Sequence, residues 1–395
     1  MLLLFEVDGY KLFDHKIQFS MFPNRRIKKL KENIVVKTIN NKEYHVLKSA
    51  IIYGPNNSGK TTFIKSLSLF KSIIEQENID SVSQDKLNFN FFDPDLNIDF
   101  KIEFLSNKKH YSYELSFNDE KKINNEVLIV DGETILNRFG KNNKCVSHVI
   151  DLLGHYENKL LVLSLPREYE DVYKGFKKFF SKLIVLQHVD ENIQSTFDIL
   201  EDPLYKEDFI RLIRNSDTNI KDVRISKDIN REKFSYVPKE VAEYLRLEST
   251  YEKNGQKISF PSILVDSLGT KKLIVYASYI LKALKENYVL VIDELDSSWH
   301  TVLTRNIFAL FNSVSNTSSQ LIASSHDLLL LDDENMFRRD QIWFTYKDIE
   351  SIHFYSLNDF RAEAGKKSNA LTNYLKGKYG ALPYPEIGDL MNEKE

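Results

Sequence analysis

One eight-residue run constrains this chain more than any other feature of its sequence. Residues 54–61 read Gly-Pro-Asn-Asn-Ser-Gly-Lys-Thr, which fits the phosphate-binding loop pattern G-x-x-x-x-G-K-[ST] at every fixed position. The apolar run 50–53 precedes the loop, and apolar residues at helical spacing follow it from Phe63 to Phe70. A strand, a glycine loop and a helix in this order predict an α/β fold that binds a nucleotide.

Each residue type in this loop has a chemical task. Gly54 and Gly59 allow the tight turn that points backbone N–H groups at phosphate oxygens, and the helix dipole adds positive potential. We expect Lys60 to reach the β- and γ-phosphates and the Thr61 hydroxyl to ligate Mg²⁺. The predicted cofactors are therefore ATP and Mg²⁺. The predicted contacts of the nucleotide in this loop are Gly54, Asn56, Asn57, Ser58, Gly59, Lys60, Thr61 and Thr62.

The second half of the site is predicted at the end of another apolar run. Residues 289–292 are Val-Leu-Val-Ile, and Asp293 and Glu294 follow directly. A strand buried on both faces must be apolar, and ligands of parallel sheets bind at the carboxyl ends of the strands. We expect Asp293 to hold the Mg²⁺ shell and Glu294 to polarise the attacking water.

Three further residues or motifs distinguish between classes of P-loop protein. Ser267 and Gly269 open a predicted helix about twenty-five residues before Asp293, where ABC ATPases carry the signature that grips the γ-phosphate of the opposite subunit's ATP. The alternative is a plain helix start with Ser267 or Thr270 as its cap. His326 follows the next apolar run and matches the switch histidine of ABC ATPases, although a lone histidine often has only a structural role. Asp296 fits the loop through which subunits sense each other.

The pattern along the chain predicts a single ABC-type head with an insertion. Residues 1–140 would form its first part, including an antiparallel β meander predicted from the period-two pattern of residues 98–117. Residues 141–265 read as a mainly helical insertion, with a second independent domain as the alternative. Residues 266–395 would complete the head. The predicted fold class is α/β, a P-loop NTPase of ABC type with a mixed or parallel sheet.

With these motifs in place, the sequence resembles the bacterial ABC-type ATPases of the abortive-infection class, the AbiL- and RloA-like proteins. These are close to the OLD ATPases and to the ATPase subunits of the Septu and PARIS systems. The resemblance covers most of the chain, and its two C-terminal blocks are the most family-specific because general ABC proteins lack them. The resembling segments are 48–61, 267–273, 292–298, 338–344 and 374–383.

The resemblance implies a role in phage defence, with the ATPase controlling a separate nuclease or toxin. The signature reads Ser-Leu-Gly-Thr instead of Ser-Gly-Gly-Gln, which argues against a transporter. The companion histidine-proline appears here as residues 299–301, Trp-His-Thr, and the Q-loop glutamine is not settled between Gln84 and Gln187. No acidic cluster of the Toprim type follows, so we expect no built-in nuclease.

Composition limits the remaining choices. The net charge of −3 gives no global basic field, so nucleic acid could bind only through a local patch such as the basic stretch 25–31, which also reads as a solvated loop. One cysteine and no long apolar run favour a soluble, cytoplasmic protein without a membrane partner. We expect self-association as an ATP-sandwich dimer. The alternatives are a DNA-repair ATPase of the RecF or SMC kind and, less well supported because only one P-loop is present, an ABC ATPase acting on translation.

Overall fold

The structure is a computed structural model of the chain. It describes residues 1–87, 89–91, 93, 95–139, 160, 169–187, 193–216, 218–226, 244–348, 351–360 and 369–382. Much of the predicted insertion and the last residue of the C-terminal block, Pro383, lie outside these ranges. The description below refers to this part of the chain.

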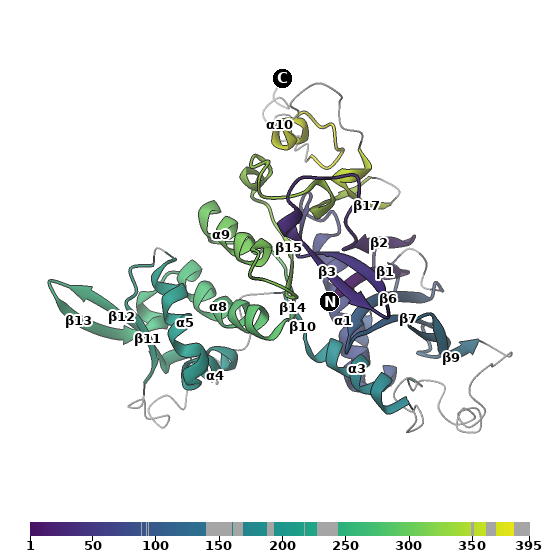
Figure 1. The fold of residues 1–395 in the computed structure, drawn as a ribbon, viewed down its shortest axis with the longest axis horizontal. Coiled ribbons are helices and arrows are strands. Elements are labelled where there is room, and N and C mark those ends of the chain that lie inside the picture. Colours follow the sequence, from purple (N-terminus) through teal and green to yellow (C-terminus); the bar gives the residue numbers. More distant parts are fainter. Residues whose placement is uncertain are drawn as a thin grey trace, which may run out of the picture.

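A central, mainly parallel sheet forms the middle layer of the molecule (Figure 1). Its strand order is β10-β14-β15-β5-β16-β17, in which the first five are mutually parallel and β17 is antiparallel. The parallel sheet predicted from the sequence is thus confirmed, and the carboxyl ends of five strands meet at one edge. The bounds are β10 (Leu183–Leu186), β14 (Val289–Ile292), β15 (Gln320–Ser324), β5 (Ser49–Tyr53), β16 (Ile342–Lys347) and β17 (Ile352–Ser356).

The strands of this sheet are apolar because both of their faces are buried. In β5, Ala50 and Ile52 face one hydrophobic cluster while Ile51 and Tyr53 face another. The first cluster holds helix α1 (Lys60–Gln76) and the second holds α9 (Thr301–Asn312), α10 (Ala370–Leu375) and part of α8 (Leu268–Glu286). Successive side chains of a strand point to opposite faces, so a continuous apolar run fills both layers.

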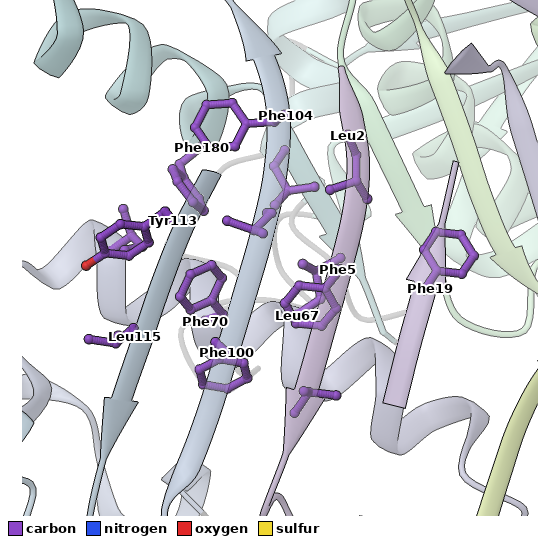
Figure 2. Packing of buried hydrophobic residues seen from close by; sticks show 14 of the residues in the cluster. Leu2, Phe5, Phe19, Leu67, Phe70, Phe100, Phe104, Tyr113, Leu115 and Phe180 are labelled. Atoms are coloured by element: carbon purple, nitrogen blue, oxygen red, sulfur yellow. The ribbon is translucent and has the colours of Figure 1, made fainter. Parts of the chain in front are cut away.

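A second sheet covers α1 from the other side. Its order β2-β1-β6-β7-β8-β9 is antiparallel throughout, which confirms the predicted meander. Figure 2 shows Phe70 of α1 next to Phe100 of β6, with Phe5 of β1 and Phe180 nearby, and the ring of Phe70 contacts all three. The bounds are β2 (Ile17–Ser20), β1 (Leu2–Asp8), β6 (Ile98–Ser106), β7 (Lys109–Phe117), β8 (Ile123–Val130) and β9 (Glu133–Phe139).

Residues 141–265, which were predicted to be mainly helical, contain both helices and strands where the structure describes them. Strand β10 belongs to the central sheet, because its four apolar residues pair in parallel with β14. A three-stranded sheet accompanies two helices and packs with them on α8, to one side of the head (Figure 1). Strand β10 is too short to be recognised by alternation, and the strands of the three-stranded sheet carry many polar residues. These elements are α3 (Glu170–Ser181), α4 (Gln194–Glu201), α5 (Pro203–Arg214), β11 (Asp222–Ile225), β12 (Leu247–Lys253), β13 (Gln256–Pro261) and α7 (Ser262–Val265).

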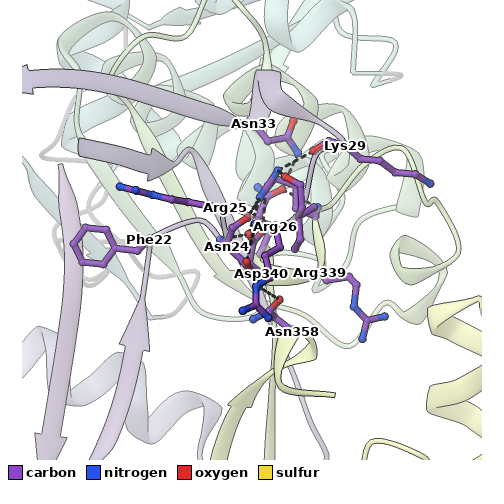
Figure 3. Close-up of polar contacts among 12 residues, drawn as sticks. Phe22, Asn24, Arg25, Arg26, Lys29, Asn33, Arg339, Asp340 and Asn358 are labelled. Atoms are coloured by element: carbon purple, nitrogen blue, oxygen red, sulfur yellow. Dashed lines mark hydrogen bonds and ion pairs between the residues drawn. The ribbon is translucent and has the colours of Figure 1, made fainter. Parts of the chain in front are cut away.

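The first family-specific block, which begins at Arg338, anchors a loop near the N-terminus. The buried Arg338 guanidinium forms an ion pair with Asp340 and donates to the carbonyls of Asn24, Ile27 and Lys29. Asp340 also accepts from the Asn24 N–H (Figure 3). The block therefore fixes the backbone of the basic stretch, which follows β2 and precedes β3 (Ile34–Ile39) and β4 (Lys42–Leu47).

Candidate functional site

The phosphate-binding loop lies where the sequence predicts it, between β5 and α1. Gly59 caps α1 with a φ of 107°, a conformation that L side chains rarely adopt. A Cβ on Gly54 would lie 2.2 Å from Thr345 Oγ1 and 2.6 Å from Ser58 Oγ, so only glycine fits there. The Ser58 and Thr345 hydroxyls are 2.5 Å apart. Asn56 and Asn57 are exposed at the loop tip, and Thr61 and Thr62 are half-buried in the first turn of α1.

Lys60 is buried at the base of this loop. Its Nζ donates to the carbonyls of Gly54 at 2.7 Å and Pro55 at 2.9 Å. Desolvation lowers the pKa of Lys60 from 10.5 to about 8, although the charges of Asp293, Glu294 and Asp296 act in the opposite direction. Strands β14 and β5 both pair in parallel with β15, so the acidic turn and the phosphate loop follow strands that end at the same edge of the sheet.

Asp293 is held at the end of β14 by its neighbours in the sheet. Its N–H donates to the carbonyl of Leu186 in β10 at 2.8 Å. The Ser324 hydroxyl donates to Asp293 Oδ1 at 2.5 Å and accepts from the Glu294 N–H at 2.7 Å. A buried carboxylate fixed in this way presents its other oxygen with little freedom, which suits a hard cation.

Glu294, Asp296 and His326 also meet at this edge. Glu294 has a φ of 51°, and its exposed carboxylate lies 3.9 Å from His326 Nε2. Asp296 Oδ2 accepts from the His326 N–H at 3.0 Å, which ties the two loops together. The buried Oδ1 of Asp296 has no hydrogen-bond partner in the described part of the chain. Left-handed backbone is uncommon for a residue with a side chain, so the turn holds Glu294 in a specific conformation.

The signature residues lie at the start of α8, against the Ser298 and Trp299 end of the acidic loop. Ser267 caps α8, because its hydroxyl accepts a hydrogen bond from the Thr270 N–H at 3.1 Å. Ser267 is therefore a helix cap, as the alternative interpretation of the sequence expected. Gly269 packs against the loop: an added Cβ would lie 2.3 Å from the Ser298 carbonyl, and Trp299 Nε1 donates to the Gly269 carbonyl at 2.9 Å. Ser267 is exposed and faces a hollow of about 400 Å³.

The donors present fit a nucleoside triphosphate with its magnesium ion. The loop, the N-terminus of α1 and the buried Lys60 offer N–H groups and a positive charge to phosphate oxygens. The Thr61 hydroxyl and Asp293 supply the oxygen ligands that Mg²⁺ prefers. The partnerless Asp296 oxygen leaves one buried acceptor at the same edge.

Several residues that shape the site were missed or left unassigned by the sequence analysis. Ser324 and Thr345 hold the acidic turn and the phosphate loop, and both sit in strands where a hydroxyl looks unremarkable. Asp266, just before Ser267, accepts hydrogen bonds from Ser249, Ser262 and Tyr251 and fixes the start of α8 on β12. The only signal of these roles in the sequence was a charged residue, Asp266, directly before the predicted signature.

The two candidate Q-loop glutamines lie in different places. Gln187 directly follows β10, whose last residue, Leu186, pairs with Ile292 and accepts from Asp293. Gln187 is thus at the carboxyl edge next to the acidic turn. Gln84 begins the short helix α2 (Gln84–Leu87), outside the central sheet. The position of β10 in the sheet therefore favours Gln187 over Gln84 as the Q-loop glutamine. The spacing of residues in the sequence does not reveal this position.

The fold and these groups define the chain as a P-loop ATPase with an α/β head of the ABC and AAA type. The model of the family described as "AAA domain, putative AbiEii toxin, Type IV TA system" matches residues 49–144 and 153–332, and the chain belongs to this family. A comparison with curated proteins finds no match. In the part of the chain that the structure describes, none of the helices has the length and apolarity needed to cross a bilayer.

A comparison with solved structures matches the chain to heads of SMC proteins, each with a TM-score below 0.5. An SmcHead bound to the C-winged helix domain of ScpA is 13% identical, with a TM-score of 0.45 over 90% of this chain and 97% of that one. The SMC head domain from Thermotoga maritima is also 13% identical, with a TM-score of 0.45 over 90% of this chain and 98% of that one. The Smc head from Pyrococcus furiosus, bound to a domain of ScpA, is 12% identical, with a TM-score of 0.44 over 96% and 98%.

Proposed function

We propose that the chain binds and hydrolyses ATP and acts as an ATP-gated sensor in anti-phage defence, where it controls a separate nuclease or toxin. The observation that carries the ATPase part is the placement of the Lys60 loop after β5 and of Asp293 and Glu294 after β14, because both strands pair in parallel with β15 and end at one edge of the sheet. The regulatory part rests on the resemblance to abortive-infection ATPases and on a family description that includes a toxin.

In the proposed mechanism each residue at this edge has one task. The phosphate loop and Lys60 bind the β- and γ-phosphates, and Thr61 and Asp293 would hold Mg²⁺, which offsets negative charge as the γ-phosphate leaves. Glu294 orients the attacking water and accepts its proton, with His326 beside it to contact the γ-phosphate. Gln187 completes the site as the Q-loop glutamine. Positioning and charge do most of this work, because phosphoryl transfer requires little covalent chemistry from the protein.

We further propose that two copies close on two ATP molecules. Gly269 packs against Ser298 and Trp299 at the far end of the acidic loop, and Ser267 is exposed beside it, so we propose that these two residues act on the partner's nucleotide. Apolar side chains exposed around the signature support a face that becomes covered on dimerisation. They are Phe260, Leu264, Val265, Leu268 and Val302.

Capture of partners from the native host tests the regulatory part. The bait is a tagged Glu294→Gln variant, which holds ATP, and the extract is treated with nuclease before mass spectrometry. A stoichiometric nuclease or toxin that survives the treatment supports the proposal. Recovery of DNA from a parallel sample without nuclease, with no protein partner in either sample, would contradict it and favour a RecF- or SMC-like ATPase that binds DNA directly.

A further inference from the structure

Lys272 is a charged side chain buried where an apolar one would be expected. It lies in the second turn of α8, five residues after Ser267, and is 1% exposed. The helix positions that follow it are apolar and pack in the core, from Leu273 to Ala277. Burying an ammonium group costs free energy unless it is well hydrogen-bonded, so its partners indicate what it does.

Those partners belong to the loop that carries the catalytic glutamate. Lys272 Nζ donates to the main-chain carbonyl of Glu294 at 2.6 Å and to that of Ser297 at 3.2 Å. The ammonium also lies over the rings of Tyr276 at 5.2 Å and Trp299 at 5.4 Å, and such contacts partly replace lost hydration. A side chain of the signature helix therefore holds both ends of the turn from Glu294 to Ser297.

The backbone of this turn needs such a support. Glu294 has a φ of 51° and Ser298 a φ of 70°, both in the left-handed region that non-glycine residues seldom adopt. Strained residues of this kind persist only where the surroundings fix them. The direction of the Glu294 side chain depends on this backbone, because the Cα position and φ set where the carboxylate can reach.

We propose that Lys272 is a positioning residue that couples the signature helix to the catalytic glutamate of the same chain. The inference rests on the proposed function. Ser267 and Gly269 at the start of α8 meet the partner's ATP, and a shift of α8 on that contact moves Lys272 and with it the Glu294 backbone. Contact of the signature with the partner's ATP thereby controls hydrolysis of the ATP bound in the chain's own site. The ATPase rate should therefore depend cooperatively on ATP concentration.

Steady-state ATPase kinetics of a Lys272→Met variant test this coupling. We expect kcat to fall at least tenfold while KM stays within about threefold, because Lys272 Nζ binds the main chain of the turn that carries Glu294. The Hill coefficient for ATP should fall towards one. Lys285→Met is the matched control: Lys285 lies on the same helix, donates to the Leu204 carbonyl at 2.7 Å and lies 4.8 Å from the centre of the Tyr205 ring, far from the acidic turn.

The possible outcomes separate the coupling from the proposed function. A folded Lys272→Met chain with wild-type kcat and Hill coefficient would refute the coupling alone, as would an equal loss in Lys285→Met. A wild-type chain without ATPase activity would refute the proposed function and the coupling with it. If Lys272→Met does not fold, Lys272→Arg keeps the charge and donors. A lowered kcat at unchanged KM then supports the coupling, and unchanged kcat refutes it.

Discussion

At the scale of single residues, Glu294 carries the chemistry of the proposed mechanism. Replacing it with Gln keeps the shape and the backbone turn but removes the group that accepts the proton of water. We expect ATP binding to be retained and hydrolysis to fall by about 100-fold or more. Single-turnover hydrolysis and nucleotide binding on the same preparation measure both. Wild-type turnover in Glu294→Gln would remove Glu294 from this role.

Lys60 predicts how ATP affinity depends on pH. Its pKa is lowered to about 8 in the free site, and ATP binding needs the charged form. Above that pH, Lys60 in the free site is mostly uncharged. ATP binding then requires Lys60 to take up a proton, and this requirement weakens the affinity for ATP. Affinity should fall about tenfold between pH 7 and pH 9.

Titrations with a fluorescent ATP analogue across this pH range check the prediction. The Lys60→Met variant should bind ATP more weakly, and its affinity should lack the pH dependence that Lys60 contributes. The variant therefore serves as the control for titration of the other groups and of ATP itself. An identical pH profile in both proteins would show that Lys60 does not titrate with a lowered pKa.

At the scale of elements, the helices and strands that could be predicted from the sequence are those that a local residue pattern specifies. The strand-loop-helix unit around Gly54 and Lys60, the strand before Asp293 and the meander all follow from motif, apolar runs and alternation. Strand β10 could not be found in this way, because its place is set by pairing with β14 across about one hundred residues of chain. The roles of Ser324, Thr345 and Lys272 likewise depend on contacts between distant segments.

The loop held by Arg338 gives a prediction at the same scale. Its guanidinium satisfies three main-chain carbonyls and the buried Asp340. Arg338→Met removes the buried cation that pairs with Asp340 and the donor to the three carbonyls, and it should cost about 3–5 kcal/mol in the free energy of unfolding. Arg339→Met is the control, since that side chain is less buried, and the loss should be clearly smaller. Urea unfolding followed by circular dichroism measures it, and equal losses would contradict the anchoring role.

At the scale of the whole molecule, the fold class was predictable while the organisation of the middle segment was not. A P-loop and an Asp-Glu strand in one chain already imply the central sheet. The three-stranded sheet beside α8 was not predicted, because β11 to β13 carry many polar residues and are stabilised by packing with α4, α5 and α8. The predicted divisions at residues 140 and 265 remain predictions.

The central claim, that ATP joins two of these chains through the signature, concerns the whole molecule as well. Sedimentation velocity of Glu294→Gln with and without ATP and Mg²⁺ tests it most directly, with Ser267→Arg added in a second protein to block the signature face. We expect a monomer without ATP, a dimer with ATP, and no ATP-dependent dimer in Glu294→Gln/Ser267→Arg even though ATP still binds. The same oligomeric state in all three samples would contradict the ATP-gated dimer.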